Sequence, residues 1–182
     1  MNWLKKHNFE SPNKKFINDL TFREVYERVT DLAGKLSSYV KQERRVAIYS
    51  NNSVDMALFF LALQCLEKEV LMLNTHLTEE EIKNQLKLLK IQVIFSYDNK
   101  FISFDEVHQS EKEDIKLIEE FEVESIAVIM NTSATTGEFK SVPLRWKQFS
   151  AHVKASRKSI GVTMMDNWLL VLPMYHISGL TI

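Results

Sequence analysis

Short apolar runs alternate with segments of helical periodicity along most of this chain, and this alternation restricts its fold strongly. The apolar runs are typical of buried strands and cover residues 45–50, 70–73, 93–96 and 126–130. Capping-box sequences at Thr21–Glu24 and Thr78–Glu81 predict where two helices begin. Because strands that alternate with helices form right-handed βαβ units, we predict one α/β domain with a largely parallel sheet flanked by helices.

Weaker patterns predict the remaining elements. We expect an edge strand at residues 101–104, further strands at 141–144 and 168–172, and a helix over 146–160. The acidic stretch from Asp105 to Glu122 indicates a solvated helix or an exposed connection, with no ligand implied. Ser178 is expected to cap a helix whose first turn contains Gly179 and Leu180.

Composition and charge exclude several classes of partner. The 182 residues are enough for one domain with a sizeable core, and 23 basic against 24 acidic residues give no electrostatic footprint for nucleic acid. The apolar run Met56–Leu66 is too short to span a bilayer, and the first residues do not resemble a signal peptide, so we expect a cytoplasmic protein. The single cysteine, Cys65, is expected to be a buried core thiol. No metal-ligating cluster is predicted.

The residues from Asn131 to Lys140 read NTSATTGEFK and directly follow the predicted strand at 126–130. Open α/β sheets bind their ligands in loops at strand ends. Hydroxyls, backbone amides and a lysine suit the oxygens of a polyphosphate, and the donors expected here are Ser133, Thr135, Thr136 and Lys140. The spacing of Gly137 and Lys140 excludes the commoner phosphate loop, which requires Gly-Lys-Ser/Thr. The alternative is a turn whose hydroxyls bond their own backbone.

A second polar segment follows the predicted strand at 168–172 and reads PMYHISGL from Pro173 to Leu180. His176 comes shortly after that strand and next to Tyr175, in the kind of loop that often carries binding residues. The alternative is a histidine that packs near a helix start and bonds to the backbone. The other histidines have no clustered partners in the sequence.

Both segments resemble signature sequences of the adenylate-forming enzymes, a family that includes acyl-CoA synthetases, nonribosomal-peptide adenylation domains and luciferases. NTSATTGEFK is similar to the family's phosphate loop, T-S-G-T-T-G-x-P-K, and Leu172–Leu180 to its P-x-x-H-x-x-G-L segment beside the acyl substrate. Together with Leu73–Leu77 (LNTHL), the chain looks most like the o-succinylbenzoate–CoA ligases of menaquinone synthesis. The resemblance implies that residues 1–182 form part of the large N-terminal domain, which binds ATP and the acyl group, and that the C-terminal remainder lies beyond Ile182.

The same resemblance implies an ATP-dependent ligase that adenylates a carboxylate, with o-succinylbenzoate as the expected substrate, and then transfers the acyl group to coenzyme A. ATP, Mg²⁺ and CoA as cosubstrate are the implied cofactors. The residues implied for the ATP phosphates are Thr132, Ser133, Thr135, Thr136, Gly137 and Lys140. The residues implied for the acyl substrate are Tyr175, His176, Ser178 and Gly179. Lys140 and His176 are the expected catalytic residues.

Three positions depart from the family pattern. Ala134 stands in place of a glycine, Phe139 in place of a proline, and His76 where arginine is common. If position 134 requires a positive φ, alanine costs about 1 kcal/mol there. Two other functions therefore stay open: a non-catalytic nucleotide-binding module, and another acyl-activating enzyme such as a fatty acyl-CoA synthetase or an amino-acid adenylation domain.

Overall fold

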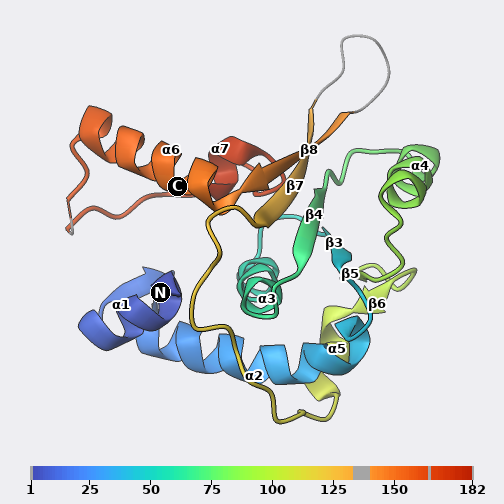
Figure 1. Ribbon diagram of the computed structural model, residues 1–182, viewed down its shortest axis with the longest axis horizontal. Helices are drawn as coiled ribbons and strands as arrows, with labels where there is room; N and C mark the ends of the chain where they lie inside the picture. The colour runs from blue at the N-terminus through green and yellow to red at the C-terminus, as the bar shows by residue number, and fades with distance from the viewer. Residues whose placement is uncertain (1, 133–139, 164, 182) are drawn as a thin grey trace.

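A computed structural model describes residues 2–132, 140–163 and 165–181, which form a six-stranded sheet with helices packed against it (Figure 1). The strand order is β6-β5-β3-β4-β7-β8, in which β8 pairs antiparallel with β7 and the other neighbours pair parallel. The predicted largely parallel α/β fold is confirmed. The strands are β3 Arg45–Tyr49, β4 Glu69–Leu73, β5 Ile94–Ser96, β6 Ile102–Ser103, β7 Ile126–Thr132 and β8 Lys140–Arg145.

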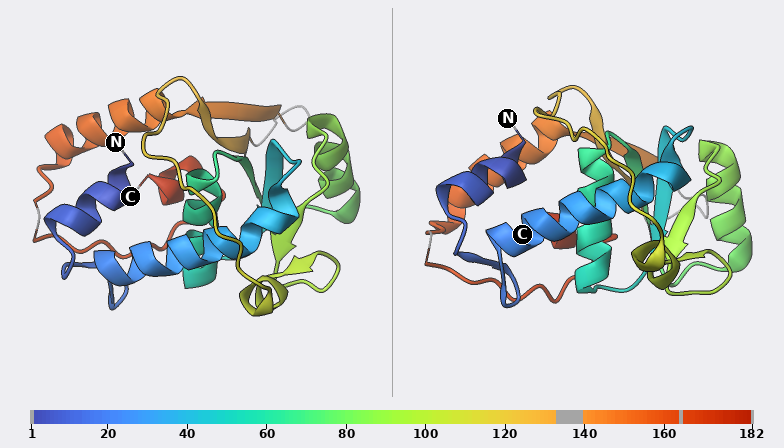
Figure 2. Two further views of the ribbon diagram at one scale, coloured as in Figure 1. Left: turned by 60° about the horizontal axis from the view of Figure 1, so that its bottom comes forward. Right: turned by 90° about the horizontal axis from the view of Figure 1, so that it is seen from below.

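Seven helices and a small hairpin complete the described part of the chain. Helices α4 and α6 lie at opposite ends of the molecule in all three views (Figures 1 and 2). The hairpin consists of β1 Lys15–Ile17 and β2 Leu20–Thr21. The helices are α1 Trp3–Glu10, α2 Phe22–Val40, α3 Val54–Cys65, α4 Glu79–Leu89, α5 Phe104–Gln109, α6 Trp146–Ile160 and α7 Ile177–Leu180.

Capping side chains fix where the central helices begin. Thr21 and Thr78 form the two predicted capping boxes, each with the glutamate three residues later. In the first, the Thr21 hydroxyl accepts the Glu24 N–H at 3.2 Å, and the Glu24 carboxylate accepts the Thr21 N–H at 2.7 Å. Ser53 starts α3 by accepting the N–H of Met56 at 3.0 Å. These bonds satisfy amides that a helix start otherwise leaves without partners.

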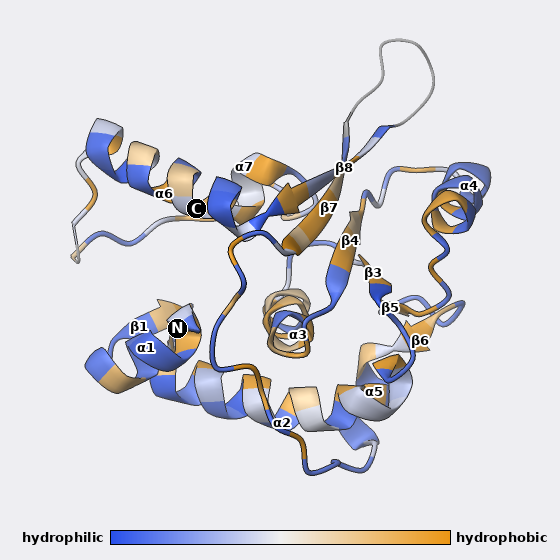
Figure 3. Ribbon diagram, viewed as in Figure 1, coloured by the Kyte–Doolittle hydropathy of each residue, from blue (hydrophilic) through white to orange (hydrophobic). Residues whose placement is uncertain are grey.

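Helix α3 is apolar on nearly every side and lies between the sheet and α2 (Figures 1 and 3). A helix without a polar face must be covered all round, so α2 forms a second layer outside it. The strands contribute alternate residues to the two faces of the sheet. On β3, Val46 and Ile48 belong to the core cluster around α3, whereas Ala47 packs in the cluster beneath α4.

Several smaller predictions are confirmed. β6 is an edge strand, α6 spans the predicted residues 146–160, and the acidic stretch forms α5 followed by an exposed connection. Cys65 is 2% exposed, and burial raises the pKa of its thiol, as expected of a core cysteine. Among the helices in the described ranges, none combines the length and apolar character that crossing a membrane requires.

The predicted strand at residues 168–172 is wrong. The segment has no regular secondary structure and pairs with no strand of the described sheet, and the side chains from Trp168 to Leu172 are exposed. A strand exists only where a neighbouring ladder accepts its backbone hydrogen bonds, and the apolar pattern cannot specify that neighbour. The apolar run therefore crosses the surface without joining the sheet.

The predicted cap at Ser178 is also wrong. Helix α7 begins one residue earlier, at Ile177, with His176 in the N-cap position and without a capping side chain. The carbonyl of His176 accepts the N–H groups of Gly179 at 3.0 Å and Leu180 at 3.2 Å. These bonds place Ser178 inside the first turn.

We expect Thr21→Ala to lower the free energy of unfolding by about 1 kcal/mol, because it removes the hydroxyl that accepts the Glu24 N–H. Thr21→Ser keeps that acceptor and is the matched control. Urea denaturation followed by circular dichroism measures both variants. Equal losses in the two would show that the methyl group of Thr21, and not its hydroxyl, stabilises the start of α2.

Candidate functional site

The carboxyl ends of β3, β4 and β5 meet at a hollow of about 440 Å³. Its lining includes Ser50, Asn51, Ser53 and Thr75. From β3 the chain passes through α3 to β4 on one side, and from β4 through α4 to β5 on the other. This reversal of direction is the place where open α/β sheets bind ligands.

A second hollow, of about 480 Å³, lies at the opposite edge of the sheet. Its lining includes Arg44 and Lys68, which precede β3 and β4, and Trp146, which follows the antiparallel β8. Four carboxylates also line it, those of Glu67, Glu69, Glu122 and Glu124. Because ligands of open parallel sheets bind at the carboxyl edge, its slightly larger size does not make it the better candidate.

The predicted phosphate segment begins and ends at the carboxyl edge. Ser133, Thr135, Thr136 and Gly137 lie outside the described residues, so their predicted role stays a prediction. Thr132 ends β7, Lys140 begins β8, and the two residues are partners in the antiparallel register. Since β7 runs parallel to β4, both ends of the segment lie at the same edge as the hollow. The side chain of Lys140 is exposed there.

A chain of amide and hydroxyl groups joins β7 and β8 just below this segment. Asn131 donates to the side-chain oxygen of Gln85 on α4 at 2.7 Å, and the Ser141 hydroxyl donates to Asn131 at 2.9 Å. Gln85 is buried, and its amide nitrogen has no hydrogen-bond partner among the described residues. Gln85 was not among the residues predicted for the site. A polar residue on the buried face of a helix was the signal that could have revealed it.

The predicted acyl segment forms a compact turn. Met174 and Tyr175 are buried in the α3 core cluster, whereas His176, Ile177 and Ser178 are exposed. A Cβ on Gly179 would lie 2.2 Å from the carbonyl oxygen of Pro173, so the turn admits no side chain at this position. His176 stands at the start of α7, as its N-cap, so the alternative interpretation is right about its place in the chain. Its side chain forms no cap hydrogen bond and is exposed, with its ring 4.9 Å from the ring of Tyr175.

Two neighbouring asparagines connect the parts of this edge. Asn51 accepts the Thr75 hydroxyl at 2.9 Å, which joins the end of β3 to the turn after β4. The side chain of Asn52 bonds the backbone of the acyl segment at Leu172 and Met174. Neither contact was predicted from the sequence. Asn51 bonds a residue 24 positions away, and Asn52 bonds residues 120 and 122 positions away, so no local pattern reveals these partners.

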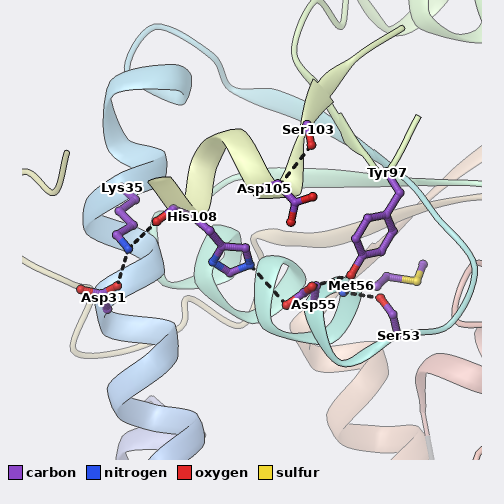
Figure 4. Close-up of polar contacts among 9 residues, drawn as sticks. All are labelled: Asp31, Lys35, Ser53, Asp55, Met56, Tyr97, Ser103, Asp105 and His108. Atoms are coloured by element: carbon purple, nitrogen blue, oxygen red, sulfur yellow. Dashed lines mark hydrogen bonds and ion pairs between the residues drawn. The ribbon is translucent and has the colours of Figure 1, made fainter. Parts of the chain in front are cut away.

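The carboxylate of Asp55, in the first turn of α3, contacts the phenol of Tyr97 and the imidazole of His108 (Figure 4). Asp55 accepts the hydroxyl of Tyr97, and its other oxygen lies 3.3 Å from Nε2 of His108. Burial, together with the neighbouring Asp55 carboxylate, raises the pKa of Tyr97 to about 12. The sequence indicated no partner for His108. The fold supplies one by bringing α5 against α3.

The Tyr97 phenol should titrate about two pH units above an ordinary tyrosine, near pH 12 instead of about 10. Because its folded pKa is raised, its contribution to stability is complete below pH 10 and is lost as the pH rises from 10 toward 12. The phenolate absorbance of the wild type minus that of Tyr97→Phe isolates this group. Asp55→Asn should lower its midpoint, and an unperturbed midpoint in the wild type would contradict the hydrogen bond.

Comparison with known proteins gives matches over nearly the whole chain. Residues 4–182 match the family described as AMP-binding enzyme. A 2-succinylbenzoate–CoA ligase from Lactococcus lactis is 48% identical over 188 residues, which cover 100% of this chain and 42% of that protein. The chain therefore spans less than half the length of this relative.

Two solved structures of o-succinylbenzoate CoA synthetase from Bacillus subtilis are similar in fold. One, in complex with the acyl-adenylate intermediate, has a TM-score of 0.90 at 26% identity and covers 99% of this chain and 51% of that chain. The other, in complex with ATP and magnesium ion, has a TM-score of 0.90 at 25% identity and covers 98% and 52%. With a family match that leaves only its first three residues uncovered, the chain belongs to the AMP-binding enzymes.

Proposed function

We propose that the full-length protein is an AMP-forming acid–thiol ligase that converts 2-succinylbenzoate into its CoA thioester, as a step in menaquinone synthesis. The observation that carries the proposal is the 48% identity, over the entire chain, to a 2-succinylbenzoate–CoA ligase. Residues 1–182 form part of its N-terminal, ATP- and acyl-binding domain, and the remainder of the enzyme completes the site. A cytoplasmic location is part of the proposal, since a lone buried thiol suits a reducing compartment.

The reaction proceeds in two displacements. A carboxylate oxygen attacks the α-phosphorus of ATP, the bond to the β-phosphate breaks, and pyrophosphate leaves with the electron pair. The product is an acyl-adenylate. The CoA thiolate then attacks its acyl carbon, the bond from that carbon to the AMP oxygen breaks, and AMP leaves with the electron pair as the thioester forms. A carboxylate is ionised at neutral pH, so the first displacement needs no general base. It needs alignment of the reactants and neutralisation of the charge that develops on pyrophosphate.

The phosphate segment suits this requirement because it offers donors and a cation. In the proposed site, Lys140 and the groups at Thr132, Ser133, Thr135, Thr136 and Gly137 hold the phosphates. The position of Thr132 and Lys140 at the carboxyl edge supports this assignment. Within the described ranges, no three histidine, cysteine or acidic side chains are grouped so that they could hold a metal. Mg²⁺ would therefore enter on the ATP phosphates, as is usual for this ion, and would add positive charge beside the leaving group.

The acyl substrate is assigned to the turn at Tyr175, His176, Ser178 and Gly179. Tyr175 is buried and fixes the turn in the core, whereas the exposed His176 ring is free to line the acyl pocket. Gly179 permits α7 to approach the carbonyl of Pro173. In this proposal His176 binds and orients the substrate and transfers no proton.

Lys140→Ala should lower ATP–pyrophosphate exchange by the full-length protein on the order of a hundredfold. The substitution removes the positive charge that would stabilise the pyrophosphate leaving group. Lys147→Ala is the matched control, since this exposed lysine of α6 pairs with Glu124 on the connection before β7. Ala134→Gly should preserve or raise exchange. Unchanged exchange in Lys140→Ala, or a large loss in Ala134→Gly, would contradict the assignment of the phosphate loop.

The acid that stimulates exchange distinguishes the open functions. We expect stimulation by 2-succinylbenzoate and none by fatty acids or amino acids. ATP binding of normal affinity without exchange for any acid would instead indicate a non-catalytic nucleotide-binding module. Exchange with a fatty acid or an amino acid would indicate a different acyl-activating enzyme.

A further inference from the structure

The side chain of Asn52 bonds the acyl segment on both sides of Pro173. Its amide nitrogen donates to the carbonyl of Leu172 at 2.9 Å, and its oxygen accepts the N–H of Met174 at 2.8 Å. Proline has no N–H, so these are the backbone groups nearest to Pro173 that can form such a pair. One amide thus reproduces the donor and acceptor of a neighbouring strand, at a place where the described sheet provides none.

The segment before Pro173 offers little other support. The side chains from Trp168 to Leu172 are exposed, and the segment joins no strand of the described sheet. Beyond the turn, His152 on α6 approaches the Thr181 hydroxyl at 3.2 Å. Asn52 therefore holds the entrance to the turn, and Met174 and Tyr175 hold its middle by burial. These contacts together determine where His176 projects.

Asn52 itself rests on a firmly held element. It immediately precedes Ser53, the cap of α3, and α3 is buried between the sheet and α2. The first turn of that helix is held further by the bonds of Asp55 to Tyr97 and His108 (Figure 4). Because Asn52 is fixed in this way, its side-chain amide holds the acyl segment at a defined position relative to the sheet edge.

We propose that Asn52 is a positioning residue for the acyl substrate. Its amide clamps the backbone at Leu172 and Met174, and the clamp sets the direction of His176 toward the bound carboxylic acid. The inference rests on the proposed ligase function for its substrate. Asn52 touches no substrate in this scheme and acts through the backbone that it holds.

Asn52→Ala removes both bonds and, because Asn52 is exposed, leaves no cavity in the core. In the full-length protein we expect kcat/KM for 2-succinylbenzoate in ATP–pyrophosphate exchange to fall about tenfold or more, the effect of losing two hydrogen bonds. The KM for ATP should stay within about twofold of the wild type, because the phosphate segment is not held by this clamp. A purely structural role would lower the unfolding midpoint and the active fraction without raising the KM for the carboxylic acid.

Two further variants sharpen the test. Asn52→Asp keeps the acceptor for the Met174 N–H but opposes a carboxylate oxygen to the Leu172 carbonyl, so it should lose activity as Asn52→Ala does. Asn167→Ala removes an exposed amide from the same segment before Pro173 and should behave as the wild type. Full activity of Asn52→Asp would show that the bond to Leu172 is not needed.

Hydrogen exchange at the Met174 amide tests the clamp without any activity. Asn52→Ala should accelerate this exchange, whereas Asn167→Ala should not. If hydrogen exchange at Met174 is unchanged in Asn52→Ala, the clamp is wrong. If hydrogen exchange is faster but kcat/KM for the carboxylic acid is unchanged, the positioning role is wrong. If the wild type catalyses no ATP–pyrophosphate exchange in the presence of 2-succinylbenzoate, the proposed substrate is wrong. The Met174 amide then still decides whether Asn52 holds the segment.

Discussion

The burial of helix α3 is the interaction on which the rest of the structure depends. Its side chains are apolar in almost every direction, so it is stable only where the sheet covers one side and α2 the other. Phe59 and Leu63 are completely buried, and each such side chain contributes about 1.5–3 kcal/mol. The layers of the domain follow from this requirement. Helix α2 has one apolar face because it covers α3, and its outer face is polar.

The candidate site inherits its geometry from the same helix. The carboxyl end of β3 leads directly into α3, and the short link between them carries Asn51, Asn52 and Ser53. These three side chains contact the turn after β4, the acyl segment and the first turn of α3, respectively. A single rigid start of a helix thus orders three neighbouring parts of the sheet edge. Polar residues are concentrated there because the backbone N–H and C=O groups beyond the end of a strand need other hydrogen-bond partners.

Local patterns predicted the elements that local forces determine. The apolar runs at 45–50 and 70–73 became β3 and β4, and both capping boxes start helices as expected. The strand at 168–172 failed because an apolar run does not reveal whether a partner strand is available. Helix α1 and the β1–β2 hairpin were missed, since they are short and have little apolar periodicity.

For the site, the sequence indicated both functional segments, but it could not indicate what holds them. Gln85 and Asn52 contact their partners across 46 and more than 100 residues, distances at which no spacing rule applies. The resemblance to the adenylate-forming enzymes agrees with the family match over residues 4–182. The roles of Ser133, Thr135, Thr136 and Gly137 stay predictions, because these residues lie outside the described part of the chain.

The only cysteine of the chain gives this fold a natural reporter of its own opening. Cys65 lies at the end of α3, where the side chain of Asn2 contacts its sulfur at 3.5 Å, and Asn2 is also the cap of α1. A thiol buried in this way, with a raised pKa, does not react with alkylating reagents. The backbone of Ile118, on the connection before β7, also bonds the Cys65 carbonyl, so labelling at Cys65 requires the segments that cover it to open. The labelling rate measures how often this local opening occurs, without any introduced probe.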